Sequence, residues 1–124
     1  MIDALPPQNL EAETGVLGSV LMDNSVIDDV LLTITDLDFY RDSHQLIYRA
    51  IVAIYARGER VDVITLEEEL KRRSDLDAVG GIDAIFTILS SVPHAANATY
   101  YAQIVKQKAV ARAVIEAAHE ILRA

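Results

Sequence analysis

The sequence predicts an all-α fold, and three observations support this class. Apolar residues recur at intervals of three and four along most of the 124-residue chain. β-Branched residues never alternate with polar ones over the length of a strand. Residues suited to helix ends, such as Asn, Ser, Thr and Gly, separate the apolar stretches. At this length the chain fits one domain, which would bury roughly two thirds of the surface of its unfolded form.

The first helix is expected to begin at Gln8 or Asn9, after an extended lead that contains Pro6-Pro7. Its core-facing residues are Leu10, Thr14, Leu17 and Leu21. Gly15 and Gly18 lie inside this helix, where together they cost about 2 kcal/mol of helix propensity. We infer a close helix crossing at these positions, because a side chain there would clash with the neighbouring helix.

The next segment is expected to contain a short helix and then an irregular connection. Asn24-Ser25 ends the first helix and caps the short helix, which is expected over residues 26–32. Residues 33–42 show no helical period, and Leu37 and Phe39 are predicted to anchor them in the core.

A longer, central helix follows, with Ser43 as its predicted cap and Gly58 at its end. One side of this helix carries His44, Ile47, Tyr48, Ile51, Val52 and Tyr55. Thr65 and Glu68 have the spacing of a capping box for a helix at residues 66–73.

Gly80-Gly81 interrupts the helical pattern, and a further helix is expected over residues 82–89. Val92-Pro93 then forces a turn, and Asn97 is predicted to cap a terminal helix that continues to Ala124. Because no helix-terminating residue such as Gly or Pro precedes Ala124, we expect the natural chain to continue beyond it.

The terminal helix is apolar over most of its circumference. From Ala109 onward its polar side chains form one narrow stripe, which consists of Arg112, Glu116, His119, Glu120 and Arg123. A heptad-like seam consists of Ile104, Lys108, Ala111, Ile115, Ala118 and Leu122, and a second seam of Val110, Val114, Ala117 and Ile121. Such a helix must be covered, either by a downstream segment or by another chain.

Composition limits the function classes. The net charge of −8 argues against a primary role in gripping nucleic acid, which needs clustered cations. Residues 71–73 are basic but follow Glu67, Glu68 and Glu69, so they have partners within the helix; Lys106, Lys108 and Arg112 are less compensated and leave a weak anionic contact open. The absence of cysteine, of a signal peptide and of a membrane-spanning apolar run predicts a cytoplasmic location without membrane contact.

Catalytic and metal-binding patterns are weak. No glycine stands in a phosphate-binding loop, and His44, His94 and His119 lack the spacing of zinc ligands. We expect a ring nitrogen of His44 to bond locally near the start of its helix. The carboxylates of Glu11, Glu13, Asp28 and Asp29 are candidates for acid-base chemistry only if the fold brings them into a dry cleft.

An ordered set of short motifs runs nearly the length of the chain. In sequence order they are Pro6-Pro7-Gln8-Asn9-Leu10-Glu11-Ala12-Glu13 with Val16-Leu17-Gly18, Asp38-Phe39-Tyr40-Arg41 with His44-Gln45, Gly80-Gly81, Val92-Pro93 with Ala95-Ala96-Asn97, and Tyr100-Tyr101-Ala102 with Ile104-Val105. Each motif alone is weak, but their order and spacing are specific. Together they resemble the amino-terminal domain of the bacterial replicative DNA helicase, the DnaB family.

The resemblance implies a compact helical head at residues 1–102 and, at residues 103–124, the first arm of a helical hairpin. The linker and the RecA-like ATPase domain that follow in the family are absent from this sequence. We therefore expect no catalysis, cofactor or metal in this chain, with ATP and magnesium needed only by the missing motor. DNA would be bound only through the full-length protein.

The resemblance also implies partners. In the family the domains form dimers, and a trimer of dimers builds a collar on the hexamer that docks the carboxy-terminal region of primase. The residues that match the self-association seam are Ile104, Ala111, Ile115, Ala118 and Leu122. Primase docking is predicted at Glu11 and Ile115, while Ala84 stands where some members carry an aromatic contact residue. A helicase loader is a further candidate partner.

Two alternatives stay open from sequence alone. The chain could be a free-standing helical adaptor or inhibitor that mimics the helicase head, or a small acid-base enzyme that uses carboxylates and His44. A RecA-like ATPase encoded after residue 124 would support the helicase domain, and a stop codon there would support the adaptor.

Overall fold

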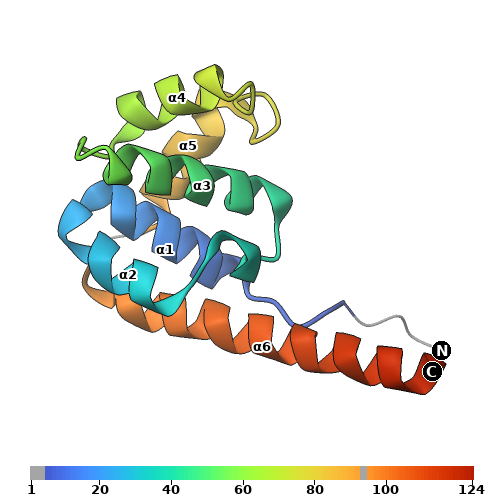
Figure 1. The fold of residues 1–124 in the computed structure, drawn as a ribbon. Helices are drawn as coiled ribbons and strands as arrows, with labels where there is room; N and C mark the ends of the chain where they lie inside the picture. Colours follow the sequence, from blue (N-terminus) through green and yellow to red (C-terminus); the bar gives the residue numbers. More distant parts are fainter. Residues whose placement is uncertain (1–4, 93–94) are drawn as a thin grey trace.

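The computed structural model describes residues 5–92 and 95–124, and the regular structure in these ranges is entirely helical (Figure 1). In chain order the elements are α1 (Leu10–Met22), η1 (Asn24–Val26), α2 (Ile27–Thr33), η2 (Asp36–Asp38), α3 (Asp42–Ala56), α4 (Val63–Arg72), α5 (Gly81–Ser90), η3 (Ala95–Asn97) and α6 (Ala98–Arg123), where η marks a short 3₁₀ helix. The predicted all-α class is confirmed. Pro93 and His94, and with them the predicted turn at Val92-Pro93, lie outside the described residues.

α1 is the central helix, and it packs against α3, α5 and α6 (Figure 1). Asn9 caps it as predicted, since its side-chain oxygen accepts a hydrogen bond of 2.9 Å from the Ala12 amide. Val16, Leu17 and Val20 are fully buried against these neighbours. α1 therefore forms the middle of the core, which explains why apolar residues occur on more than one of its faces.

The two glycines of α1 lie where other helices approach most closely. A Cβ atom on Gly15 would lie 2.7 Å from the ring of Tyr101 in α6. A Cβ atom on Gly18 would lie 2.5 Å from Val92 Cγ2 and 2.6 Å from the carbonyl oxygen of Ile88 in α5. The predicted close helix crossing is confirmed, and it involves two helices.

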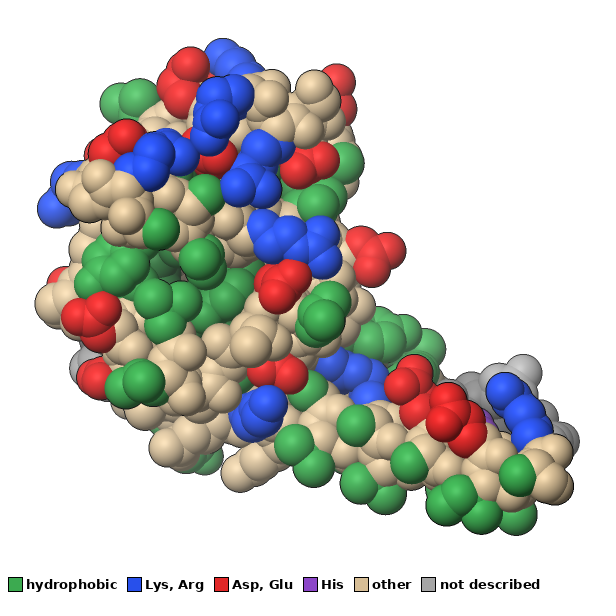
Figure 2. All heavy atoms as spheres, in the orientation of Figure 1, with side chains coloured by type: hydrophobic (Ala, Val, Ile, Leu, Met, Phe, Trp, Pro, Cys, Tyr) green, Lys and Arg blue, Asp and Glu red, His purple; other side chains and the backbone are tan. Residues whose placement is uncertain are grey.

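α6 packs on the head with its first half and then extends away from it as a rod (Figures 1 and 2). Ala98, Ala102 and Val105 are buried, and the last half-buried residue is Arg112. Residues 113–123, called the arm below, are exposed throughout and span roughly 16 Å at 1.5 Å per residue. The boundary at residue 102 stays a prediction, and burial against the head ends further along the helix.

Glu13 of α1 organises the start of α3. Its carboxylate accepts hydrogen bonds from the backbone amides of Tyr40 and Arg41, at 2.7 and 3.4 Å. The same carboxylate lies 2.7 Å from Nδ1 of His44, and both side chains are buried. The prediction that His44 bonds locally is wrong, because its partner stands 31 residues earlier in the chain.

Several local predictions need correction. Phe39 is buried as expected, but Leu37 is 69% exposed and is no core anchor. Ser43 does not cap α3, since the helix already includes Asp42. The capping box of α4 is formed by Asp62 and Thr65, three residues earlier than the predicted pair of Thr65 and Glu68.

The predicted cap of α6 is confirmed in its position, but the Asn97 side chain makes no capping hydrogen bond in the described structure. Asn97 belongs to the short helix η3 that leads into α6.

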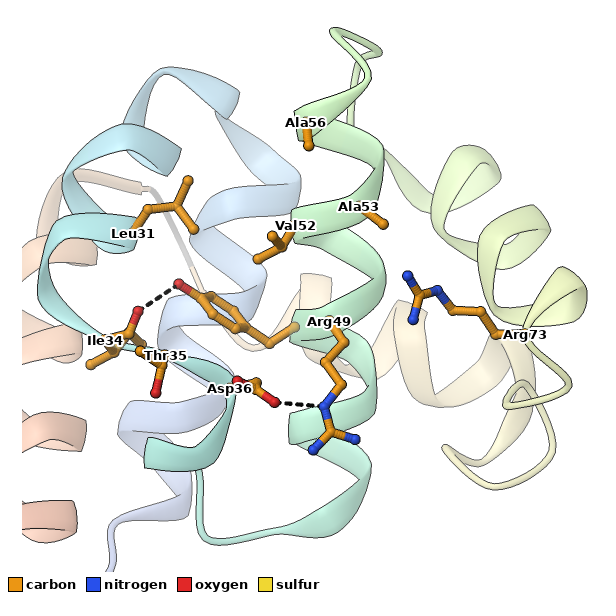
Figure 3. A pocket seen from close by; sticks show the side chains of 10 residues that line it. Leu31, Ile34, Thr35, Asp36, Arg49, Val52, Ala53, Ala56 and Arg73 are labelled. Atoms are coloured by element: carbon orange, nitrogen blue, oxygen red, sulfur yellow. Dashed lines mark hydrogen bonds and ion pairs between the residues drawn. The ribbon is translucent and has the colours of Figure 1, made fainter.

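Polar contacts tie α3 to the segment between α2 and η2. The hydroxyl group of Tyr48 donates a hydrogen bond of 3.0 Å to the Ile34 carbonyl oxygen, and burial raises the pKa of Tyr48 to about 12. Arg49 Nε donates to Asp36 Oδ2 at 2.6 Å (Figure 3). These two bonds hold the connection that follows α2 against one face of α3.

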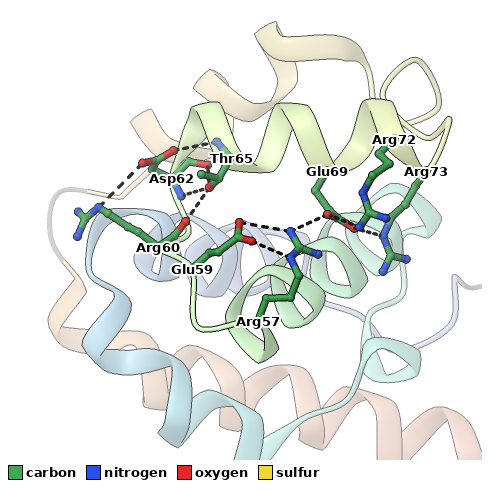
Figure 4. Close-up of polar contacts among 8 residues, drawn as sticks. All are labelled: Arg57, Glu59, Arg60, Asp62, Thr65, Glu69, Arg72 and Arg73. Atoms are coloured by element: carbon green, nitrogen blue, oxygen red, sulfur yellow. Dashed lines mark hydrogen bonds and ion pairs between the residues drawn. The ribbon is translucent and has the colours of Figure 1, made fainter.

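Three arginines converge on the buried carboxylate of Glu69 in α4 (Figure 4). Arg72 and Arg73 reach it from the same helix end, at 2.6 and 2.8 Å, and Arg57 reaches it from the end of α3 at 3.0 Å. The Glu69 side chain is only 1% exposed. The bonds from Arg72, with those from Arg73 and Arg57, lower the pKa of Glu69 to about 2.

The Glu69 cluster predicts an acid-sensitive contribution to stability. Because its pKa is lowered by folding, Glu69 stabilises the fold above the unfolded pKa of about 4.5, and this stabilisation is lost as the pH falls toward 2. We expect Glu69→Gln to lower the free energy of unfolding by about 2–3 kcal/mol above pH 5, and by less at lower pH. Urea unfolding of both proteins between pH 2.5 and pH 6 (roughly the range that the two pKa values define) measures this difference.

The matched control for Glu69 is Glu68→Gln, which removes an exposed carboxylate whose partner is Lys71 at 3.6 Å. Its effect should stay below about 0.5 kcal/mol, as for other exposed ion pairs. A Glu69→Gln protein as stable as this control at pH 6 would contradict a stabilising role of the cluster.

The helix crossing predicts that Gly18→Ala destabilises the protein, although alanine favours helix formation by about 0.5–1 kcal/mol. The new Cβ atom would meet a backbone oxygen in α5, which cannot rotate away. We expect a net loss of about 1–3 kcal/mol in thermal or urea unfolding. Gly15→Ala should cost less, because the half-buried Tyr101 ring can turn aside; the reverse order would contradict this reading of the crossing.

Candidate protein-docking surface

The residues predicted for self-association fall into two groups on α6. Ile104 and Ala111 are half-buried against the head. Ile115, Ala118 and Leu122 lie on the exposed arm, where Ile115 is 42% and Leu122 is 83% exposed. Val110, Val114 and Ile121 of the second predicted seam are also exposed. Hydrophobic side chains consequently follow the edge of the arm in Figure 2, as at surfaces that bind another protein.

Over residues 5–92 and 95–124, no helix is both long and apolar enough to cross a membrane. The exposed arm also carries the charged residues Glu116, Glu120 and Arg123. A protein surface, which can cover apolar residues beside charged ones, fits this pattern.

Arg112 fixes the point at which the arm leaves the head. Its guanidinium donates hydrogen bonds to the carbonyl oxygens of Pro7, at 2.8 Å, and Asp38, at 2.7 Å. It also lies over the Tyr40 ring, 5.5 Å from the ring centre. Six residues earlier in α6, Lys106 Nζ lies 3.4 Å from Asp38 Oδ2. Two of the basic residues considered for an anionic contact are thus bound within the chain.

A cleft lies beside Arg112, between the N-terminal lead, η2 and the start of the arm. Its volume is about 630 Å³, within the range of ligand-binding clefts. Leu5 and Pro6 from the lead, Leu37 from η2, and Ile115 and His119 from α6 contribute to its walls. Leu5 is 72% and Leu37 is 69% exposed, so apolar surface continues outside the cleft. Leu37 therefore belongs to the apolar surface at this cleft and not to the core.

Glu11 lies at a different, smaller cleft. It is exposed in the first turn of α1, where the cleft of about 360 Å³ also contacts Asn9, Tyr101 and Ile104. Glu11 and Ile115, the two residues predicted to dock primase, thus line separate clefts, which are linked through the lead that Arg112 holds. Ala84 is half-buried in α5.

The candidate acid-base residues form an internal contact. Glu13 and His44 do meet, but both are buried and the carboxylate already bonds two backbone amides. Neither residue lines a cleft described above. In the described part of the chain, no group of three or more His, Asp or Glu residues is placed to hold a metal ion.

Comparison with known proteins assigns the chain to a family. Residues 5–107 match the DnaB-like helicase N terminal domain. Replicative DNA helicase DnaB of Mycobacterium leprae is 46% identical over 118 residues, which cover 95% of this chain and 20% of that protein. The crystal structure of the N-terminal domain of DnaB helicase from Mycobacterium tuberculosis is 45% identical, with a TM-score of 0.94 over 96% of this chain and 83% of that chain.

A more distant structure shares the fold. The structure of a DnaB-like replicative helicase and its interactions with primase is 24% identical, with a TM-score of 0.82 over 93% of this chain and 27% of that chain. The chain spans about a fifth of the length of the M. leprae relative. With most of its length matched by the family and its fold shared with a solved member, the chain belongs to the DnaB-like helicase N-terminal domain family.

Proposed function

We propose that this chain is the assembly and primase-docking domain of a replicative DNA helicase. The arm carries the proposal, because it presents apolar residues on two seams without a cover from the described part of the chain. Membership of the helicase family supports it. The domain itself carries out no chemistry, and the unwinding motor with its ATP and magnesium belongs to the rest of the full-length protein.

Self-association uses the arm. Ile115, Ala118 and Leu122 lie three or four residues apart, so they form one continuous strip when the arm packs beside another helix. A second hairpin arm and the arms of neighbouring subunits supply the cover. In the full-length protein these contacts build dimers, and three dimers form the collar of the hexamer.

Primase docks through its carboxy-terminal region at the two clefts that Glu11 and Ile115 line. Glu11 offers an exposed carboxylate at the N-terminal end of α1, and Ile115 offers an apolar contact at the start of the arm. A partner that spans both would combine an ionic and an apolar contact. The structure of a DnaB-like replicative helicase with its primase interactions, which shares this fold, supports the choice of partner.

Replacing Ile115 and Leu122 together by aspartate should convert the protein to a monomer. Two charges on the seam oppose burial against another helix, and both positions are exposed, so the head should keep its fold. Light scattering and analytical ultracentrifugation over a range of concentrations measure the change, with dimers or larger forms expected for the unmodified chain.

The control is the pair Gln103→Asp and Gln107→Asp, which adds the same charge at exposed positions of α6 away from the seam. It should leave the association unchanged. If the unmodified chain is itself monomeric at high concentration, the proposed self-association is lost.

Glu11→Lys should weaken binding of the carboxy-terminal region of the cognate primase by about tenfold, equal to 1.4 kcal/mol. Calorimetric titration measures the affinity, and Asp29→Lys on α2 is the control, since it makes the same charge change at another exposed position. Equal affinity for Glu11→Lys and the unmodified chain would remove Glu11 from the docking site.

A further inference from the structure

A groove separates α2 from α3 on the face of the head shown in Figures 2 and 3. Its volume is about 460 Å³. Leu31 of α2 forms one wall, and Val52, Ala53 and Ala56 of α3 form the other. No lining residue comes from α1, α5 or α6, so the groove is distinct from the clefts of the arm.

The floor and one end of the groove are held by polar bonds. Tyr48 is buried beneath it, and its hydroxyl group donates to Ile34. Arg49 and Asp36 close one end through their 2.6 Å ion pair. A groove that is already formed binds a partner without first ordering its own walls, which lowers the free-energy cost of association.

The charge at the rim differs from that of the whole chain. The charged residues that line the groove are Arg49, Arg73 and Asp36, an excess of one positive charge in a protein with a net charge of −8. Arg73 projects from the end of α4 toward α3 (Figure 3). The Nε of Arg73 donates to Glu69 Oε2 at 2.8 Å, which orients the guanidinium toward the groove. The two terminal NH2 groups of the guanidinium can then bind a carboxylate of a partner.

We propose that this groove binds an amphipathic helix with acidic residues, supplied by a partner protein. Apolar side chains on one face of the helix would fill the space between Leu31 and Val52, and carboxylates at its edge would meet Arg73 and Arg49. This combination matches recognition of a helix in an apolar groove with charges that set its orientation.

A second copy of this chain fits the groove less well. Its exposed arm is apolar and carries one arginine, Arg123, against two glutamates, Glu116 and Glu120, which is an excess of only one negative charge. The arm therefore offers the two arginines of the rim fewer unpaired carboxylates than a helix with acidic residues along its edge would offer.

The test uses the 124-residue chain and two designed helical peptides of about 16 residues, long enough to span the groove. One carries leucines on one face with glutamates at its edges, and the other carries lysines in place of the glutamates. We expect fluorescence anisotropy to detect binding of the acidic peptide, weakening as salt is added, and little binding of the basic one. In NMR spectra, amide shifts should concentrate in residues 31–36 and 48–56.

Matched variants locate the site. Leu31→Glu and Ala56→Glu, within the groove, should weaken binding of the acidic peptide by about tenfold or more, while Leu32→Glu, at a neighbouring position that is 86% exposed and outside it, should not. Arg73→Gln should weaken binding and reduce its salt dependence. Arg72→Gln is its control, because Arg72 also binds Glu69 but does not line the groove. Thermal unfolding checks that each variant is folded.

Four outcomes would overturn the proposal. They are absence of binding by the acidic peptide, equal binding of both peptides, equal effects of Leu31→Glu and Leu32→Glu, and loss of self-association in Leu31→Glu, which would assign the groove to a second copy.

Discussion

The close approach of α5 and α6 to α1 is the constraint on which the rest of the structure depends. Gly15 and Gly18 are one turn apart, yet each admits a different helix. Gly15 lets the Tyr101 ring of α6 approach, and Gly18 admits the end of α5. Because α6 is a continuous helix, its packing on α1 also sets the direction of the arm, whose residues are all exposed. The docking surface is thus positioned by the packing of the head.

Glu13 makes a second connection from α1, to the start of α3. The first amides of a helix lack partners within the helix, and Arg41 at the cap position offers no side-chain bond. The carboxylate of Glu13 accepts hydrogen bonds from the amides of Tyr40 and Arg41, which immediately precede α3, and so lies at the N-terminal end of this helix. The contact with His44 completes this arrangement. A carboxylate and a histidine at hydrogen-bond distance therefore serve to join two helices.

The sequence predicted those features that depend on neighbouring residues. Helical periods, the Asn9 cap and the two glycines are local signals, and the order of short motifs indicated the family. The predicted helix cap was wrong where the sequence allows two capping boxes three residues apart. In α4 the box is formed by Asp62 and Thr65, and not by Thr65 and Glu68. The prediction that Leu37 lies in the core is wrong, because the apolar character of a residue in a turn does not reveal which way its side chain points. The partners of Arg112 lie 105 and 74 residues away, so no local pattern could identify its role.

The short helix η2 connects the two proposed binding surfaces. The carboxylate of Asp36 pairs with Arg49 at one end of the groove, whereas the carbonyl oxygen of Asp38 accepts a bond from Arg112 at the base of the arm. Leu37, between them, points into the cleft beside Ile115. Since these residues are consecutive, a displacement of η2 that changes one surface also changes the other. Arg49 of α3 and Arg112 of α6 each bind this turn, which keeps both surfaces in a fixed relation to the head.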